Sequence, residues 1–544
     1  MTRILVIQLD RLGDAIQTTP LFQELHMAHP EATIDLLVTK EAALVLNGMP
    51  GLNNMMTLPM DSVAAWSLRI REEVASGTIP DEVMQSLARL DFPFYDKVIN
   101  VSHSEYSAWL TQRIPAAQRQ GGLLNARGEW IFSGPWHNYL MALVSFREAN
   151  AFNLVDLFRA DGETGRVCAQ RLFVNVAEDL TFAQPESPYI VLNPGASKTE
   201  RCWSRQSFAQ LADMLWQRGY VPVLMGAPAD VEICSEVASL SEYDILNVCG
   251  KTSLPEAARL LEGAEALVSN DTGAVHLAAA VDTPVIGIYG FSAFFRETGP
   301  WGAGHILLQT EYQKEEASLN PISTQLVLHA VLYRLGKSTL KELEAHVVKG
   351  IGAWQSFFLP SGADPVGGMS YLPLHVSSLS FEQWSAYLLR HILAAQLSDE
   401  HDIDLDYLEQ KYITKELLWP EDAMKDLVEF KASGAILETQ LRRFCEDVRV
   451  FLKTLEKDNN IDFSQLEKQG KAIDDEFQNL DKEEQRFSPQ RLIVSHLCWR
   501  QRMLPALPLQ KSLLYYRDYL IDAQNILQRL MRTMESFAHA TGLR

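Results

Sequence analysis

The chain has 544 residues, of which 47% are hydrophobic and 22% are charged. Because this length exceeds what one hydrophobic core usually organises, we expect two to four domains. The formal net charge of −21 argues against broad binding to the phosphates of a nucleic acid. A local basic patch is compatible with that charge, and its candidates are Arg113, Arg119 and Arg127.

The six cysteines contain no CxxC pair and no nearby histidine at zinc-ligand spacing, so neither a zinc site nor a disulfide framework is indicated. No apolar run reaches membrane-spanning length, because Asp271, His276 and Asp282 interrupt the most apolar region. The N-terminal stretch MTRILVIQLDRLGD enters a strand pattern at once and lacks the features of a signal peptide. We therefore expect a cytoplasmic protein.

The N-terminal part predicts a β-α-β unit. A continuous apolar strand over residues 4–9 is followed by RLGDAIQTTP, a helical pattern and a second strand over residues 33–38. Such a unit predicts a parallel sheet. Gly13 and Asp14 then fall at the carboxyl end of the first strand, where ligand sites form in open α/β sheets. Mixed helices around 63–74 and 82–90 and a strand over 97–101 are expected next.

A second α/β series begins near residue 189. It contains the strand YIVLN, the loop PGASKTERCW, a helix over 204–218, the strand YVPVLM, a helix after Asp230, the strand DILNV, the turn GKTSL and a helix ending near Leu261. Two doubly wound halves with a cleft between them follow from this order. The fingerprint GxGxxG occurs in neither half, which argues against a nicotinamide or flavin enzyme.

Residues 266–290 predict a strand, an Asn-Asp-Thr-Gly turn, a short helix and a second strand. Unpaired N–H groups from Thr272 to Val275 and the positive end of the helix dipole suit a pyrophosphate. Gly273 allows close approach of a ligand to the backbone, and His276 lies one helical turn after Thr272. An ordinary βαβ turn with a capped helix is the alternative.

The pattern changes after about residue 335. Residues 350–374 resemble an irregular connector or a small β element, and apolar residues then repeat in heptads, which predicts an antiparallel helical bundle or coiled-coil hairpin. The seams are formed by Leu437, Leu441, Phe444, Val448, Phe451 and Leu455, by Leu466, Ile473, Phe477 and Leu480, and by Leu513, Tyr516, Leu520, Ala523, Leu527, Leu530, Met534 and Phe537.

Three segments, in this order, resemble glycosyltransferase family 9, which includes the ADP-heptose:lipopolysaccharide heptosyltransferases. They are RLGDAIQTTPLFQELHMAHPEATIDLLV, NPGASKTERCWSRQSFAQLADML and SNDTGAVHLAAAVDTPVIGIYG. The resemblance covers about residues 1–330 and implies a GT-B fold, in which two Rossmann-like domains face a cleft, and an inverting transfer without a metal. We expect domains at 1–165 for the acceptor and 166–335 for the donor, a connector at 336–375 and an all-α helical domain at 376–544.

The resemblance implies that Asp14 is the catalytic base. An inverting transfer needs a carboxylate that takes the proton of the acceptor hydroxyl, and a strand-to-helix turn facing the cleft presents Asp14 suitably. The alternative is an aspartate that only caps its helix.

The resemblance also implies a donor site. Arg201 stands where the family has a phosphate-binding lysine, a departure that keeps the charge but changes the geometry. Ser197 and Lys198 lie on the same loop, although Lys198 can equally be solvated. Backbone groups of Thr272 and Gly273 complete a cradle that needs no metal.

Three further elements are assigned to the donor on the resemblance. Asp230 stands where the family places an acidic residue for the ribose, unless it only caps its helix. The turn containing Thr252, Ser253 and Leu254 resembles the segment that reads the base. Asp271 and His276 are expected to hold the donor sugar or phosphate.

We therefore expect a glycosyltransferase that needs no cofactor and moves heptose from ADP-heptose to a lipopolysaccharide-core or other glycan acceptor. Peripheral contact with the inner membrane is compatible with a glycolipid acceptor, and the helical domain is predicted to dock a partner or a second protomer. One alternative is a family member that uses another nucleotide sugar or a protein acceptor. Another is a non-catalytic nucleotide-sugar-binding scaffold that acts through the helical domain.

Overall fold

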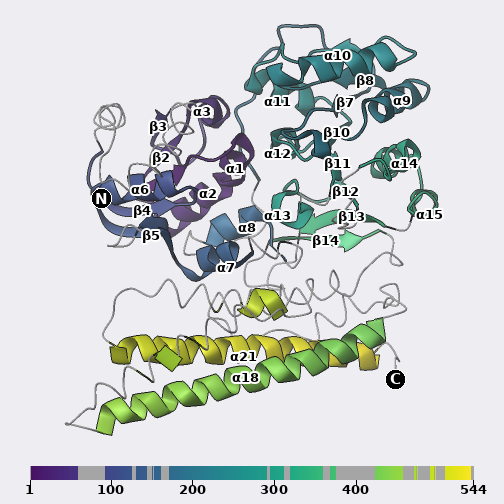
Figure 1. Cartoon of the computed structure of the whole chain (residues 1–544). Coiled ribbons are helices and arrows are strands. Elements are labelled where there is room, and N and C mark those ends of the chain that lie inside the picture. The colour runs from purple at the N-terminus through teal and green to yellow at the C-terminus, as the bar shows by residue number, and fades with distance from the viewer. Residues whose placement is uncertain are drawn as a thin grey trace. The chain divides into compact units, whose positions relative to one another are not determined.

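The chain divides into two compact units in the computed structural model (Figure 1). The first unit comprises Met1–Trp130, Phe152–Gly362 and Val366–Ser378, and the second comprises Ile131–Ala151, Ala363–Pro365 and Leu379–Arg544. The structure describes residues 2–58, 92–124, 130–143, 147, 150, 152–160, 171–290, 294–310, 319–348, 350–358, 368–374, 423–457, 468, 471–472, 475, 490–494, 497 and 509–540.

The first half of the first unit is built on a parallel sheet whose strands run in the order β3-β2-β1-β4-β5. Its strands are β1 (Arg3–Gln8), β2 (Thr33–Thr39), β3 (Asn54–Leu58), β4 (Tyr95–Asn100) and β5 (Ala116–Leu124). Its helices are α1 (Leu12–Gln17), α2 (Thr19–Ala28), α3 (Lys40–Leu46), α6 (Glu105–Arg113) and α8 (Leu154–Arg159). The predicted β-α-β unit is confirmed. The helices expected around 63–74 and 82–90 lie outside the described residues.

The second half has a sheet in the order β14-β13-β12-β11-β10-β7-β8-β9. Its strands are β7 (Tyr189–Asn193), β8 (Val221–Leu224), β9 (Leu246–Asn247), β10 (Ala266–Asn270), β11 (Val285–Tyr289), β12 (Ile306–Thr310), β13 (Ile351–Phe358) and β14 (Met369–Pro373). Its helices are η3 (Thr199–Arg201), α9 (Arg205–Trp216), η4 (Pro228–Asp230), α10 (Val231–Leu240), α11 (Leu254–Glu262), α12 (Gly273–Ala280), α13 (Phe295–Thr298), α14 (Thr324–Arg334) and α15 (Leu340–Glu344). The strands β7, β10 and β11 are fully buried, as expected for parallel strands covered on both faces. The second α/β series is therefore confirmed.

The stretch predicted as a connector contributes two strands to this sheet. β13 pairs antiparallel with β12, and β14 pairs antiparallel with β13. Trp354 of β13 and Tyr371 of β14 are buried against Phe295, with ring centroids 5.4 and 4.9 Å from that ring. The small β element, rather than an irregular connector, is what forms here.

The second unit contains β6 (Trp130–Ser133), α7 (Pro135–Leu143) and two long helices, α18 (Ala423–Lys457) and α21 (Leu509–Ala540). The long helices lie side by side (Figure 1). The outer two seams are confirmed for the members whose side chains the structure describes, all of which are buried: Leu437, Leu441, Phe444 and Val448 in α18 and Leu520, Ala523, Leu527, Leu530 and Met534 in α21. The middle seam, from Leu466 to Leu480, falls outside the described residues. None of the helices described is long and apolar enough to cross a membrane.

Candidate active site

Two helix N-termini, one from each half of the first unit, pack against each other. A Cβ atom placed on Gly13 of α1 would lie 2.7 Å from Cδ2 of His276 in α12. A Cβ atom on Gly273 would lie 3.7 Å from Cδ2 of Leu12. Because each helix has a glycine in its first turn at the contact, Gly13 in α1 and Gly273 in α12, the two first turns meet closely. The contact places the first turn of α1, which contains Asp14, against the start of α12; Figure 1 shows the two helices.

Asp14 lies in the first turn of α1 and accepts a hydrogen bond from the backbone N–H of Arg11, at 3.2 Å. The carboxylate therefore does cap its helix. Burial, and next the charge of Asp10, raise the pKa of the half-buried Asp14 from 3.8 to about 6, against the opposing effects of His103 and Arg11. A carboxyl group with this proton affinity suits a general base near neutral pH, so capping and catalysis are compatible.

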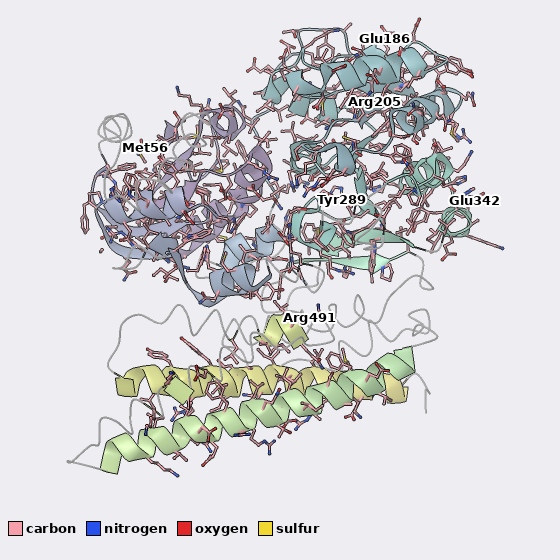
Figure 2. The ribbon with its side chains drawn as sticks, in the orientation of Figure 1. Met56, Glu186, Arg205, Tyr289, Glu342 and Arg491 are labelled. Carbon is pink, nitrogen blue, oxygen red and sulfur yellow. The ribbon has the colours of Figure 1, made fainter. Side chains whose placement is uncertain are left out.

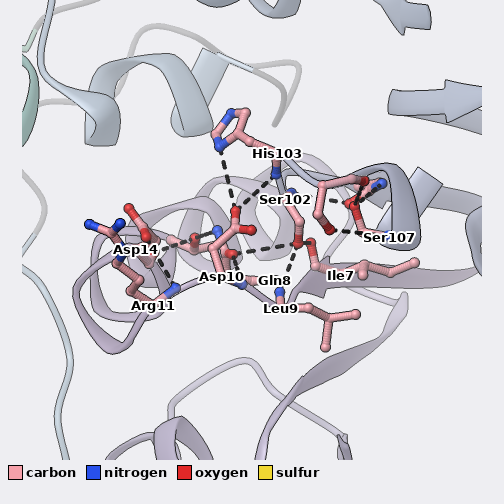
Figure 3. A network of polar contacts seen from close by, with 12 residues as sticks. Ile7, Gln8, Leu9, Asp10, Arg11, Asp14, Ser102, His103 and Ser107 are labelled. Carbon is pink, nitrogen blue, oxygen red and sulfur yellow. Dashed lines mark hydrogen bonds and ion pairs between the residues drawn. The ribbon is translucent and has the colours of Figure 1, made fainter. Parts of the chain in front are cut away.

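Asp10 and His103 form a charge pair next to Asp14 (Figure 3). The backbone N–H of His103 donates to Oδ2 of Asp10 at 2.9 Å, and Nδ1 of His103 lies 3.5 Å from the same oxygen. Burial would lower the pKa of His103, but the hydrogen bond and charge of Asp10, with Asp14 and Glu297, raise it overall. The imidazole is thus stabilised as a cation among three carboxylates.

Asparagines at the ends of β7 and β10 fix the loops of the second half. Asn193 donates to Oγ1 of Thr272 at 3.2 Å. Asn270 donates to the carbonyl oxygens of Pro194 and Gly195, at 2.9 and 3.1 Å, and accepts from the backbone N–H of Trp203 at 3.0 Å. The loop after β7 and the turn before α12 are therefore held together at one edge of the sheet.

The N–H groups expected to bind an anion are partly used. Oγ1 of Thr272 accepts from the N–H of Ala274 at 3.3 Å, and the N–H of Val275 donates to the carbonyl of Thr272 at 3.2 Å. The expectation of unpaired N–H groups throughout Thr272 to Val275 is wrong for these two residues, because the cap and a tight first turn consume them.

Arg201 and Asp271 are brought together. Their ion pair is 3.3 Å long, and both side chains are less than one fifth exposed. Ser197 and Lys198, on the same loop, are exposed, and Nζ of Lys198 lies 3.8 Å from Glu200. Of the three loop residues predicted to meet the donor phosphates, the structure thus places Arg201 against the central turn and leaves the other two in solvent.

Asp230 adjoins the same loop. Its Oδ2 accepts a hydrogen bond from the N–H of Ala227 at 2.9 Å. A Cβ atom placed on Gly195 would lie 2.3 Å from Oδ1 of Asp230, so the glycine leaves room for this carboxylate. The turn with Thr252, Ser253 and Leu254 follows β9, the neighbour of β8 in the sheet. At its start, the N–H of Gly250 donates to the carbonyl of Gly226. Ser253 is engaged in capping α11 with Glu256, so the side chain of Ser253 is already in use.

His276 and Tyr289 are buried with polar atoms that have no partner in the described part of the chain. These atoms are Nδ1 of His276 and the hydroxyl of Tyr289, which ends β11 (Figure 2). Burial lowers the pKa of His276 to about 4, so its imidazole is neutral at neutral pH. Burial raises the pKa of Tyr289, and the charge of Asp271 adds to this effect. A neutral imidazole and a phenol can hydrogen-bond a ligand without adding charge.

Sequence reasoning missed Asp10, His103, Asn193, Asn270 and Glu297. For four of them a signal existed: Asp10 and His103 follow neighbouring parallel strands, and the two asparagines end the strands YIVLN and ALVSN. Glu297 lies in a four-residue helix with no recognisable pattern.

Two of the three arginines that could supply a local basic patch make contacts within the first unit. Arg119 donates to the carbonyl oxygens of Thr111, Ile114 and Ala116, and Arg113 lies over the ring of Trp109 at 3.5 Å. Both guanidinium groups thus serve the end of α6. Arg127 is outside the described residues. Among the residues that the structure describes, no group of three or more His, Cys, Asp or Glu side chains is arranged to hold a metal ion.

The sequence of the first unit is similar to known proteins. Residues 85–323 match the family model described as glycosyltransferase family 9 (heptosyltransferase). Lipopolysaccharide heptosyltransferase 3 of Escherichia coli (strain K12) is 27% identical over 300 residues, which cover 53% of this chain and 82% of that protein. Lipopolysaccharide heptosyltransferase 2 of Salmonella typhimurium is 26% identical over 314 residues, covering 54% and 83%.

Among solved structures, a glycosyl transferase family 9 protein from Veillonella parvula aligns with a TM-score of 0.48 and 22% identity, over 62% of this chain and 98% of that one. The two long helices of the second unit lie beyond the residues that the family model matches. The chain is therefore a glycosyltransferase, and its residues 85–323 are similar to the heptosyltransferases of glycosyltransferase family 9.

Proposed function

We propose that the protein transfers heptose from ADP-heptose to a lipopolysaccharide-core acceptor, with inversion and without a metal. The names of the relatives, lipopolysaccharide heptosyltransferases 2 and 3, support the sugar and the acceptor class. The observation that carries the proposal is the position of Asp14, a carboxyl group with a pKa near neutrality at the contact between the two halves. A GT-B arrangement places the acceptor on the first half and the donor on the second.

In the proposed reaction, Asp14 takes the proton of the acceptor hydroxyl as its oxygen attacks the anomeric carbon. The new glycosidic bond forms on the face opposite the diphosphate, and the bond from the anomeric carbon to the phosphate oxygen breaks. The electron pair of that bond leaves with ADP. Configuration inverts because a single displacement occurs.

The second half stabilises the leaving ADP in this proposal. Arg201 and backbone groups of Thr272 and Gly273 meet the diphosphate, which replaces the charge that a metal supplies in other transferases. Asp230 accepts the ribose hydroxyls. The turn at residues 252–254 meets the base, and Asp271 with His276 holds the sugar or its phosphate.

Asp14→Asn tests the proposal. With ADP-heptose and lipopolysaccharide from a heptose-deficient strain, we expect transfer to fall about 10²-fold or more, the usual loss for a general base. Binding of ADP is expected to stay nearly unchanged, because Asp14 meets the acceptor. The assay is run in EDTA. Strict dependence on added magnesium or manganese would overturn the metal-free reaction, and equal loss of binding and rate would make Asp14 structural.

Two alternatives have distinct outcomes. A family member with another donor would release its nucleotide from a UDP- or GDP-sugar and not from ADP-heptose. A scaffold would bind a nucleotide sugar without turnover, and Asp14→Asn would then have no effect on any rate. The cytoplasmic location and the peripheral membrane contact stay predictions from the sequence.

A further inference from the structure

The first half of the first unit contains a charged pair, Asp10 and His103, that the proposed reaction does not use. Asp10 follows β1 and His103 follows β4, and these strands are neighbours with Ile7 paired to Asn100. Because parallel strands end at one edge, the two residues emerge together, on the same edge as Asp14.

Both loops are locked by buried polar contacts (Figure 3). The N–H of Asp10 donates to Oε1 of Gln8 at 3.0 Å, and the N–H of Leu9 donates to Oγ of Ser102 at 2.7 Å. The N–H of Ser102 donates in turn to Oδ1 of Asn100 at 3.1 Å. The geometry of the pair is thus set by the backbone and is not left to the rotamers of exposed side chains.

The imidazole of His103 is also held in place by an aromatic ring. It stacks on Phe158 of α8, with ring centroids 6.1 Å apart and planes inclined by 24°. Its side chain is 27% exposed and that of Asp10 is 17% exposed, so solvent screens the pair only partly.

Asp10 and His103 both affect the ionisation of Asp14. Asp10 opposes ionisation of Asp14, while His103 and Arg11 favour it. The charged groups that face His103 are Asp10, Asp14 and Glu297 of α13. Without a cation at position 103, the carboxylates of Asp10, Asp14 and Glu297 would lose the imidazolium that faces them, and Asp14 would keep its proton up to a higher pH.

We propose that Asp10 and His103 form a positioning pair, in which Asp10 holds His103 as a cation and His103 keeps Asp14 ionised for proton transfer. This inference rests on the proposed role of Asp14 as the base. The pair does not touch the reacting atoms. Its effect is electrostatic, and it sets the lower pH limit at which Asp14 works.

The test is the pH profile of kcat/KM, measured with ADP-heptose and heptose-deficient lipopolysaccharide. In the wild-type chain we expect the acid limb near pH 6. His103→Gln is expected to move this limb upward by about one pH unit, the scale of one nearby charge. Asp10→Asn removes a negative charge that opposes ionisation of Asp14, and the double variant removes both charges of the pair, so the limb of both variants is expected at or below the wild-type position.

The matched control is His26→Gln, which changes an exposed histidine of α2 and is expected to leave the profile in place. A merely structural role for His103 would lower the rate at all pH values and leave the limb where it is. That result, or a downward shift in His103→Gln, would overturn the inference.

A second measurement needs no turnover. In the full chain labelled at histidine Cε1, the His103 signal is assigned by its loss in His103→Gln, or in His103→Asn if the first variant does not fold. We expect Asp10→Asn to lower the pH at which His103 titrates, because the variant removes the hydrogen bond and the charge of Asp10. An unchanged titration of His103 in Asp10→Asn would overturn the pairing. If Asp14→Asn keeps full transfer, the proposed base fails first; if it abolishes transfer and His103→Gln leaves the acid limb in place, only the role of the pair fails.

Discussion

Asp14 meets two opposing demands. Burial and the nearby charge of Asp10 raise the pKa of Asp14 to a value that suits a general base. The same two effects disfavour the charged carboxylate in the folded state. The pKa is about 6 in the folded protein and 3.8 in the reference state, so the folded state binds the proton more tightly. The contribution to stability is therefore fully present below about pH 4 and is lost as the pH rises through about 6.

Asp14→Asn should accordingly stabilise the protein at pH 8 and not at pH 4. Two pKa units at about 1.4 kcal/mol each set an upper limit of ~3 kcal/mol on the gain in the free energy of unfolding. Thermal melting at both pH values measures it. Asp179→Asn, which changes an exposed carboxylate, is the control and should respond equally at both. If Asp14→Asn were less stable than the wild type at pH 8, the ionised Asp14 would not destabilise the folded state as we infer.

Arg201→Ala should weaken binding of ADP by ~1.5–3 kcal/mol, the scale of a charge-assisted hydrogen bond. The change also removes the cation that pairs with Asp271, whose negative charge lies beside the proposed diphosphate site. Calorimetric titration with ADP gives the dissociation constant. Lys198→Ala, at an exposed position of the same loop, should have a smaller effect. An equal loss in both variants would mean that the loop acts only through its total charge.

The contact between α1 and α12 depends on a missing side chain. Gly13 gives the imidazole of His276 its space, and that ring has little room to move because it is buried. An alanine in a helix is favoured over glycine by ~1 kcal/mol, whereas overpacking costs ~1–3 kcal/mol. The steric term is therefore the larger of the two.

Gly13→Ala should destabilise the protein by ~1–2 kcal/mol and lower the transfer rate, because the first turns of α1 and α12 must separate. In a His276→Ala background the same change should become neutral or stabilising, and the difference is the coupling energy. Gly273→Ala is the control for stability, since its new methyl group would meet Leu12 at an ordinary 3.7 Å. Additive effects of Gly13→Ala and His276→Ala in thermal melting would exclude the contact.

The molecule as a whole joins an α/β unit to a unit with two long helices, and the chain crosses between them more than once. The second sheet needs β13 and β14, which follow α15 and cover Phe295 through Trp354 and Tyr371. A chain that ends at residue 335 lacks both strands and exposes the edge of β12 and an apolar face.

Residues 1–378 expressed alone should bind ADP with nearly the wild-type dissociation constant, whereas residues 1–335 should aggregate or lose binding. The reason is that the proposed donor site and its whole sheet lie within the longer piece. Circular dichroism and titration with ADP compare the two. If residues 1–378 fold but bind no ADP, the helical unit contributes to the donor site.

The sequence alone determined the two α/β series, the turn from Asp271 to His276 and the outer helical seams, because these rest on local periodicity and on short motifs with fixed spacing. It also placed Asp14 at the carboxyl end of the first strand and Arg201 on the loop after the strand YIVLN, since parallel strands present their carboxyl ends at one edge. Ser197, Lys198 and the residues at 252–254 stay predictions for donor binding.

Only the tertiary structure decided which of these residues meet. The contact of Gly13 with His276, the ion pair of Arg201 with Asp271 and the pairing of Asp10 with His103 join segments that are far apart in the chain. Periodicity carries no information on such contacts, because they depend on how strands are ordered within a sheet and on how the two halves pack. The proton affinity of Asp14 is decided at the same level, since burial and the neighbours brought by β4 set it.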